Sequence, residues 1–148
     1  MPTQPRRIGF EIRTVHNLIK RNMDSKKPPE LNAATGVHGW VIHYFYKNRD
    51  HDTFQRDFET HFSIRRSTAT QILKLMETNG LITRQPVPYD GRLKKIVLTE
   101  KAIEIHNKID KNMDEMEETL TRGITPEEED TFYRVLDKIK ANLEVDKC

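Results

Sequence analysis

Three cations beside an expected turn are the residues of this chain best suited to binding chemistry. The stretch LITRQPVPYDGRLKKIVLT, residues 81–99, sets two short β-favouring runs around a Pro/Asp/Gly turn. Its second run carries Arg92, Lys94 and Lys95. Contacts from Lys and Arg to phosphates release condensed counterions, so a group of this kind favours a polyanionic partner.

The distribution of charge along the chain supports the same interpretation. The whole chain holds 25 Lys and Arg against 23 Asp and Glu, a net charge of only +2. Residues 63–95, however, hold seven basic residues against two acidic ones, whereas residues 100–148 hold eight against fourteen. The middle third is therefore a basic island that suits a polyanion. The alternative is an ordinary solvated surface of mixed charge.

Motifs for catalysis or for metal binding are not evident in the sequence. The chain has no Gly-rich phosphate loop, no nucleophile elbow and no two-histidine metal motif on a helix, so we do not expect an enzyme or a cofactor. His38 and His43 are five residues apart, which does not place them on one helical face, and we expect no metal site. The single cysteine, Cys148, excludes an intramolecular disulfide and a cysteine-based metal cage.

The chain length of 148 residues predicts one domain with a substantial core. No apolar run approaches the ~20 residues that a membrane-spanning helix needs, and the first ten residues lack the apolar core of a signal peptide. We therefore expect a cytoplasmic protein without a membrane partner.

Hydrophobic periodicity predicts six helices and one hairpin. Paired prolines at residues 28–29 end the first helix, and Gly80 ends the fourth. The sequence TPEE at 125–128 predicts the start of the last helix, with Thr125 as the cap, Pro126 in the first position and Glu128 reaching back. The apolar positions that form the expected faces and stripes of these helices are, in chain order, Ile8, Ile12, Val15 and Ile19; Val37, Val41, Tyr44 and Phe45; Phe54, Phe58 and Phe62; Ala69, Ile72, Leu75 and Met76; Ile105, Ile109, Met113, Met116 and Leu120; and Phe132, Leu136, Ile139 and Leu143.

A helix-turn-helix followed directly by a two-stranded ribbon is the winged-helix arrangement. Residues 53–99 resemble the DNA-binding core of the MarR family of bacterial transcriptional regulators, with STATQILKLMETNGLI as the recognition helix and DGRLKKIVLT as the wing. The resemblance implies a mainly α fold with a small β-hairpin wing, in which a winged helix-turn-helix core is flanked by N- and C-terminal dimerisation helices. It implies a single domain over 1–148, with the core at 30–99 and the helical dimerisation region at 1–29 and 100–148.

The resemblance also implies how double-stranded DNA is bound. The helix at about 66–79 enters the major groove, where its polar side chains contact bases and phosphates. The wing enters the minor groove with Arg92, while Asp90 holds the guanidinium or the turn in place. Lys94 and Lys95 point to opposite sides of a strand, so at most one touches the DNA backbone. The expected DNA-binding residues are Arg65, Arg66, Ser67, Thr68, Thr70, Gln71 and Lys74 in the helix and Asp90, Arg92, Lys94 and Lys95 in the wing.

One position departs from the family pattern. Family members usually place Ser, Thr or Asp just before the recognition helix, whereas Arg65 occupies that position here. Either Ser63 caps the helix instead, or Arg65 is free to grip phosphate.

The apolar stripes of the first and last helices exceed what a small winged core can cover, which predicts a two-fold homodimer. Two recognition helices then face successive major grooves of a pseudo-palindromic operator. The expected interface residues are Ile8, Ile12, Val15, Phe132, Leu136, Ile139 and Leu143.

MarR-like proteins often bind a small effector between the dimerisation helices and the core, and His16, Trp40, His43 and Tyr44 are candidates for such a pocket. The resemblance therefore implies a ligand-responsive repressor. Two alternatives stay open: a winged-helix protein-interaction adaptor, and a metal-responsive regulator of the same fold.

Overall fold

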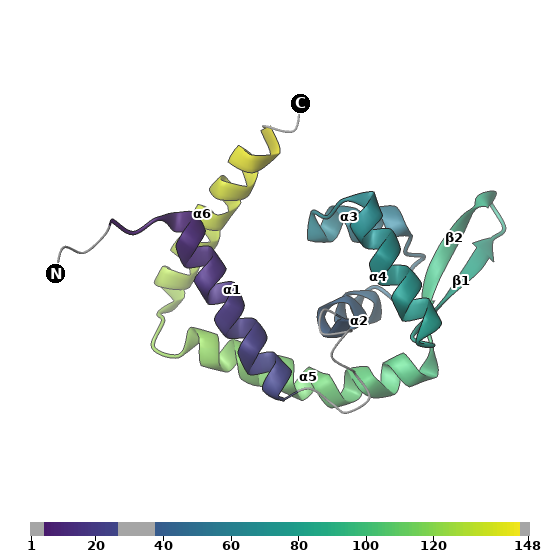
Figure 1. Cartoon of the computed structure of the whole chain (residues 1–148), viewed down its shortest axis with the longest axis horizontal. Helices are drawn as coiled ribbons and strands as arrows, with labels where there is room; N and C mark the ends of the chain where they lie inside the picture. The colour runs from purple at the N-terminus through teal and green to yellow at the C-terminus, as the bar shows by residue number, and fades with distance from the viewer. Residues whose placement is uncertain (1–4, 27–37, 146–148) are drawn as a thin grey trace. The chain divides into compact units, whose positions relative to one another are not determined.

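The basic hairpin packs with the three helices directly before it in the computed structural model of the chain, which describes residues 5–26 and 38–145 (Figure 1). Val37, the paired prolines and Cys148 lie outside these residues. The elements are, in order, α1 (Ile8–Ser25), α2 (His38–Lys47), α3 (Gln55–Phe62), α4 (Arg66–Thr78), β1 (Ile82–Val87), β2 (Asp90–Leu98), α5 (Glu100–Thr121) and α6 (Pro126–Val145). The predicted mainly α fold with one hairpin is confirmed.

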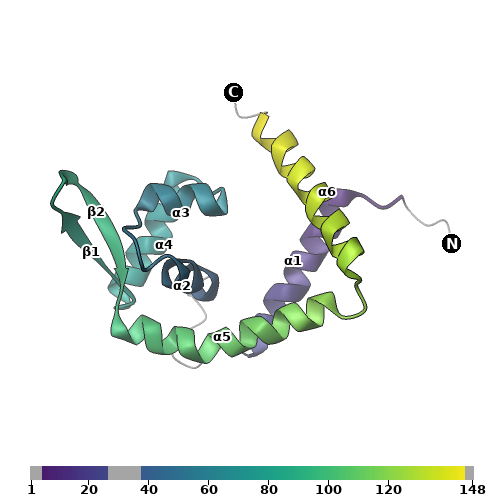
Figure 2. The same ribbon diagram turned by 180° about the vertical axis from the view of Figure 1, so that it is seen from behind.

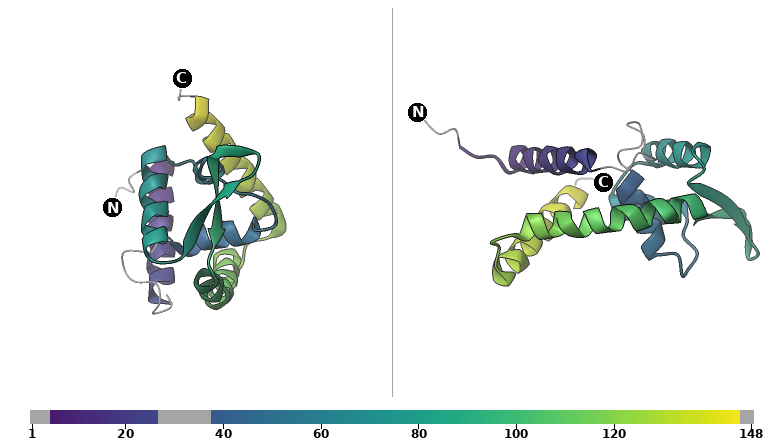
Figure 3. Two further views of the ribbon diagram at one scale, coloured as in Figure 1. Left: turned by 90° about the vertical axis from the view of Figure 1, so that its right-hand side faces the viewer. Right: turned by 90° about the horizontal axis from the view of Figure 1, so that it is seen from below.

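The chain divides into two compact units, Met1–Asn112 and Met113–Cys148, and α5 contributes to both. In the first unit, α3 packs against α4, α4 against β1, and α2 against β2, an arrangement that can be followed from both sides (Figures 1 and 2). The hairpin tip extends away from these three helices (Figure 3). Among the described residues, no helix has the length and apolar character that a bilayer crossing requires.

The core of the first unit is built from the periodic positions of its helices. Phe58 of α3 and the apolar face of α4 are fully buried, and Phe45 of α2 contacts Phe58 with ring centroids 5.6 Å apart. The completely buried residues of α4 are Ala69, Leu73 and Met76. Burying such side chains stabilises the fold by about 1.5–3 kcal/mol for each large apolar group.

The inward face of α4 differs from the predicted one at a single position. Leu75 was predicted to lie in the core, but its side chain is 36% exposed, and Leu73 is buried instead. The apolar residues Ile72, Leu73, Leu75 and Met76, interrupted only by Lys74, leave the exact phase of the helix open, and packing against α3 and β1 decides it. Ile72 is half-buried at the edge of the core.

A turn residue ends α4 and a capping box begins α6, both where the sequence predicts. Gly80 follows the C-cap residue of α4, Asn79, and has a φ of 73°, a left-handed conformation that favours glycine. At the start of α6, the Thr125 amide donates to Glu128 Oε1 and the Glu128 amide donates to Thr125 Oγ1, both at 3.2 Å. This reciprocal pair is the predicted capping box.

The hairpin is a regular antiparallel pair whose register runs from Ile82 opposite Leu98 to Pro86 opposite Lys94. The register shifts between Pro86 and Val87, just before the turn. Proline has no amide donor, so a two-stranded ribbon with free edges is a sheet that can hold it. The core-facing residues of the ribbon are Ile82, Val87 and Ile96.

The burial difference between two leucines of α4 gives a test of the fold. We expect Leu73→Ala to lower the free energy of unfolding by ~2–5 kcal/mol, because it leaves a cavity in the core. Leu75→Ala is the matched control and is expected to cost about 1 kcal/mol or less, because its side chain is already partly in water. Urea unfolding at one fixed protein concentration measures both, and equal losses would contradict the placement of α4.

Candidate functional site

The polar face of α4 is exposed because its opposite face is locked into the core. Ala69, Leu73 and Met76 lie at helical spacing on the buried side. The side chains predicted to read DNA therefore lie on the open side of the helix. Those exposed residues are Arg66, Ser67, Thr68, Thr70, Gln71 and Lys74.

The start of α4 resolves the question left by Arg65. Arg65 is the N-cap residue, with extended backbone angles and no side-chain capping hydrogen bond. Ser63 does not cap α4: it ends α3 instead, in a left-handed conformation with a φ of 51°. The first turn of α4 thus begins without a side-chain cap, and the exposed Arg65 side chain stands beside it.

Two residues that the sequence analysis missed connect α3, α4 and the hairpin. Gln55 of α3 donates from Nε2 to Thr70 Oγ1 at 2.9 Å. Arg84 of β1 donates to Gln55 Oε1 at 3.4 Å and forms an ion pair with Glu77 of α4 at 3.4 Å. Thr70 is therefore held by the protein as well as exposed, and Arg84 is engaged in packing rather than free. Spacing along the chain carries no signal for contacts of this kind, because three different elements supply them.

The wing has one almost fully exposed cation beside its turn. The Arg92 side chain is 97% exposed. The Arg92 amide donates to Asp90 Oδ1 at 2.9 Å, and the guanidinium Nε lies 4.0 Å from the same oxygen. Asp90 thus closes the turn through the backbone, and the guanidinium extends into solvent beside it.

A carboxylate outside the hairpin holds its second lysine. Lys95 Nζ lies 3.5 Å from Asp52 Oδ1, and the Tyr89 hydroxyl donates to Asp52 Oδ2 at 3.0 Å. Asp52 lies in the segment between α2 and α3, so it links the wing to the helical core. Lys94 is exposed. The two lysines therefore differ in what they can reach, as the alternation of a strand requires.

Within the described ranges, no hydrogen bond or ring contact joins the four predicted pocket residues to one another. His16 and Trp40 are exposed. Tyr44 packs among rings, with its centroid 4.5 Å from that of His61 and 5.2 Å from that of Phe45. A shared effector pocket for these four residues stays a prediction.

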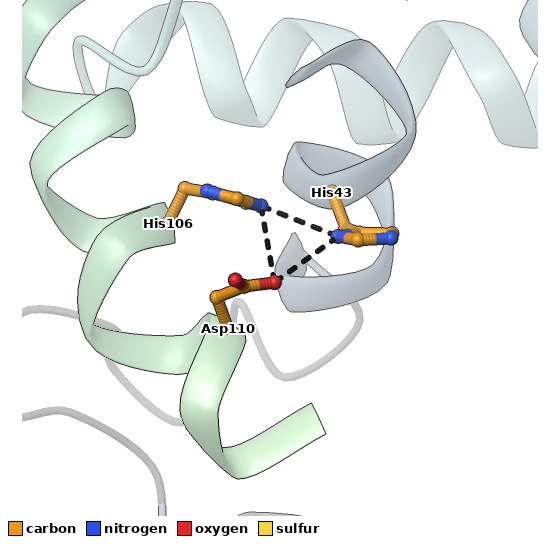
Figure 4. A group of neighbouring side chains, drawn as sticks. All are labelled: His43, His106 and Asp110. Atoms are coloured by element: carbon orange, nitrogen blue, oxygen red, sulfur yellow. Dashed lines mark hydrogen bonds and ion pairs between the residues drawn. The ribbon is translucent and has the colours of Figure 1, made fainter. Parts of the chain in front are cut away.

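His43 belongs to a different group, formed with two residues of α5. Its Nδ1 lies 3.2 Å from His106 Nε2, and both nitrogens lie 3.9 Å from Asp110 Oδ1 (Figure 4). Burial lowers the pKa of His106 below its usual value, and Asp110 acts in the opposite direction. Spacing along the chain could not predict this group, because its two histidines are 63 residues apart.

Apolar side chains are exposed along α1 and α6. In α1, Ile8 is 64% and Phe10 is 67% exposed. In α6, Phe132 is 57% and Leu143 is 65% exposed. Ile12 and Val15 are also exposed, and Leu136 and Ile139 are half-buried. The residues predicted to form a dimer interface are thus accessible to a second molecule.

Comparisons with known proteins agree with this architecture. Residues 34–93 match the model of the MarR family. The HTH-type transcriptional repressor IacR of Pseudomonas putida is 24% identical over 136 residues, covering 91% of this chain and 78% of IacR. A crystal structure of the transcription regulator MarR from Oenococcus oeni PSU-1 superposes with a TM-score of 0.81 and 28% identity, covering 91% of this chain and 99% of that one. The S. aureus MepR–DNA complex gives a TM-score of 0.80 and 22% identity, with 93% and 96% covered.

The contacts of Asp52 generate a prediction about the wing. Asp52→Ala removes the partner of both Lys95 and Tyr89, so we expect the amides of β1 and β2 to exchange with solvent up to several-fold faster, as suits a partly exposed ion pair. Hydrogen exchange followed by mass spectrometry measures this. Asp50→Ala, a nearby exposed carboxylate, is the control, and hairpin exchange that responds equally to both variants would remove Asp52 as the anchor.

Proposed function

Because the chain belongs to the MarR family, we propose that it is a sequence-specific, double-stranded DNA-binding transcriptional regulator. In this proposal it binds a pseudo-palindromic operator as a homodimer and acts as a ligand-responsive repressor. The observation that carries the proposal is the pairing of an outward polar face on α4 with a wing whose Arg92 is 97% exposed. The family consists of regulators rather than enzymes, and the proposed activity needs no cofactor.

In the major groove, α4 supplies side chains of the types that read bases. Gln71 pairs with adenine through two hydrogen bonds and Arg66 with guanine. Ser67 and Thr70 contact phosphates or thymine methyl groups, Lys74 contacts a phosphate, and Thr68 lies beside them on the polar face. Thr70 takes part through a side chain already oriented by Gln55, and Arg65 grips phosphate at the uncapped helix start.

In the minor groove, Arg92 reads width and negative potential rather than a unique base code. Its turn is closed by Asp90 through the backbone amide, so the carboxylate keeps the loop in shape. Lys94 contacts the DNA backbone, whereas Lys95 stays with Asp52 and holds the wing in place. MepR, which has the same fold, has been crystallised with DNA, and this supports the use of the winged core for that purpose.

Dimerisation in this proposal is driven by the exposed apolar stripes of α1 and α6. A homodimer places two recognition helices about one helical turn of DNA (~34 Å) apart, which matches a pseudo-palindromic site. Repression is supported by the name of the relative IacR, and ligand response and a cytoplasmic location rest on the family resemblance. A protein-interaction adaptor is less well supported, because the winged core exposes polar and cationic groups rather than a set of aromatic anchors.

Removing the wing arginine tests DNA binding. We expect Arg92→Ala to weaken binding to the duplex that flanks the gene for this chain by ~1–3 kcal/mol, because the minor-groove cation is lost while the fold stays intact. Fluorescence anisotropy at a stated salt concentration measures the affinity, and circular dichroism checks the fold. Arg122→Ala, which removes a cation between α5 and α6, is the control. Full-strength binding by Arg92→Ala would take Arg92 out of the site.

Placing a charge in the α6 stripe tests the homodimer. Leu143→Asp puts a carboxylate on an exposed apolar position, and we expect dimer dissociation to rise at least tenfold, because a desolvated charge is costly in an apolar interface. Ala141→Asp adds the same charge on the opposite side of α6 and is the matched control. Sedimentation equilibrium gives the dissociation constants. A wild-type chain that sediments as a monomer would refute the proposed dimer.

A further inference from the structure

We propose that His43, His106 and Asp110 form a binding site for one divalent transition-metal ion of the zinc class. The three side chains come from two helices, α2 and α5, and point toward one another (Figure 4). Their ligand atoms, one per residue, all lie within 4.8 Å of one another. No residue of the proposed DNA interface takes part in this group.

The donor set determines which class of ion the group suits. Two imidazole nitrogens and one carboxylate oxygen are ligands that zinc accepts readily. Calcium and magnesium prefer sites made of oxygen atoms alone. A group with two nitrogens among three donors therefore favours zinc or a similar transition-metal ion over the hard cations.

The spacing of the three atoms fits an ion at their centre. The two nitrogens are 3.2 Å apart, and each lies 3.9 Å from Asp110 Oδ1. A point equidistant from all three lies about 2.1 Å from each atom, which matches the usual zinc–nitrogen and zinc–oxygen distances. An ion near this point needs only small side-chain adjustments to accept a fourth ligand.

Hydrogen bonding alone accounts poorly for the same arrangement. The two nitrogens can share one proton, but a separation of 3.9 Å is too long for a hydrogen bond from either ring to Asp110. His106 is only 2% exposed, and its Nδ1 is buried without a hydrogen-bond partner among residues 5–26 and 38–145. A buried imidazole costs free energy that an apolar residue at the position would avoid, so its presence favours a role for the Nε2 atom that faces His43 and Asp110.

Ring packing orients the ligands before an ion binds. The Tyr46 ring stacks on His106 with centroids 3.8 Å apart and an interplanar angle of 17°, and the His43 ring is nearly parallel to that of His106. This stacking holds the imidazole in place. The side chains of His43 and Asp110 are 28% and 48% exposed, which leaves a route for the ion and for a water ligand.

An ion at this site would bridge α2 and α5. The helix α2 packs against β2 of the wing, and α5 continues past Asp110 into the second unit of the chain. Binding therefore stabilises the arrangement of α2 and α5 in which the ligands meet. This step rests on the proposed function: through it, the ion would change the affinity for DNA and so act as a regulatory ligand.

The test measures zinc binding to the full-length chain, without DNA, after treatment with a chelator and dialysis. We expect one zinc ion per chain in a competition titration against a chromophoric chelator, and we expect His43→Ala and Asp110→Asn each to weaken binding at least tenfold. Both substituted side chains are partly exposed, so neither variant leaves a large buried cavity. His51→Ala and Asp50→Asn, at exposed positions outside the group, are the matched controls.

Cobalt(II) gives a second readout that a purely structural role would not move. We expect visible absorption bands typical of a four-coordinate ion in the wild type and their loss in Asp110→Asn. Unchanged zinc affinity in both ligand variants would overturn the site, even if zinc binds elsewhere on the chain. A wild-type chain that binds no zinc at millimolar concentration would overturn it as well.

Operator binding with and without zinc separates this inference from the proposed function. We expect zinc to change the duplex affinity of the wild type but not that of Asp110→Asn. DNA binding that is identical with and without zinc in a zinc-binding wild type would overturn the regulatory step. A wild-type chain that binds DNA but no zinc would refute the metal site alone, and a wild-type chain that binds zinc but no DNA would refute the proposed function alone.

Discussion

The burial of one face of α4 is the constraint on which the candidate DNA surface depends. Ala69, Leu73 and Met76 are completely removed from water, so the rotation of α4 about its own axis is fixed by the core. A helix turned by one residue would bury polar groups and expose leucine, at a cost of several kcal/mol. Gln71 and Lys74 thus point outward because the opposite face of α4 is packed. Side chains on the exposed face can be chosen for DNA contacts with little loss of folding stability.

The hairpin needs a different kind of support, because a two-stranded ribbon has little core of its own. Its base is buried through Ile82 and Ile96, and farther out Asp52 holds it through Lys95 and Tyr89. One cation is therefore used to position another: Lys95 is engaged with the protein, and Arg92 at the tip is left to meet a partner. Lys95 and Arg92 contribute equally to the net charge, but only Arg92 is available to a binding partner.

Periodicity and turn chemistry predicted the order of elements, the capping box of α6 and the stop at Gly80, because these depend on residues close together in the chain. They misplaced one leucine of α4, since a run of apolar residues at 72, 73 and 75 fits more than one phase. Contacts between elements could not be predicted from periodicity or turn chemistry. The Gln55 bridge, the Asp52 anchor and the pairing of His43 with His106 each join residues that only the fold brings together.

The position of the histidine group within α5 relates the two proposals to each other. His106 and Asp110 are one turn apart, near the point where α5 passes from the first unit to the second, while His43 belongs to α2 beside the wing. A bound ion contacts neither the reading face of α4 nor Arg92, so its effect on DNA has to pass through the relation of α2 to α5. A ligand shifts such an equilibrium only by its difference in affinity between the two states. Because all three metal ligands are needed to hold the ion well, the separation of these two helices is the variable that zinc would sense.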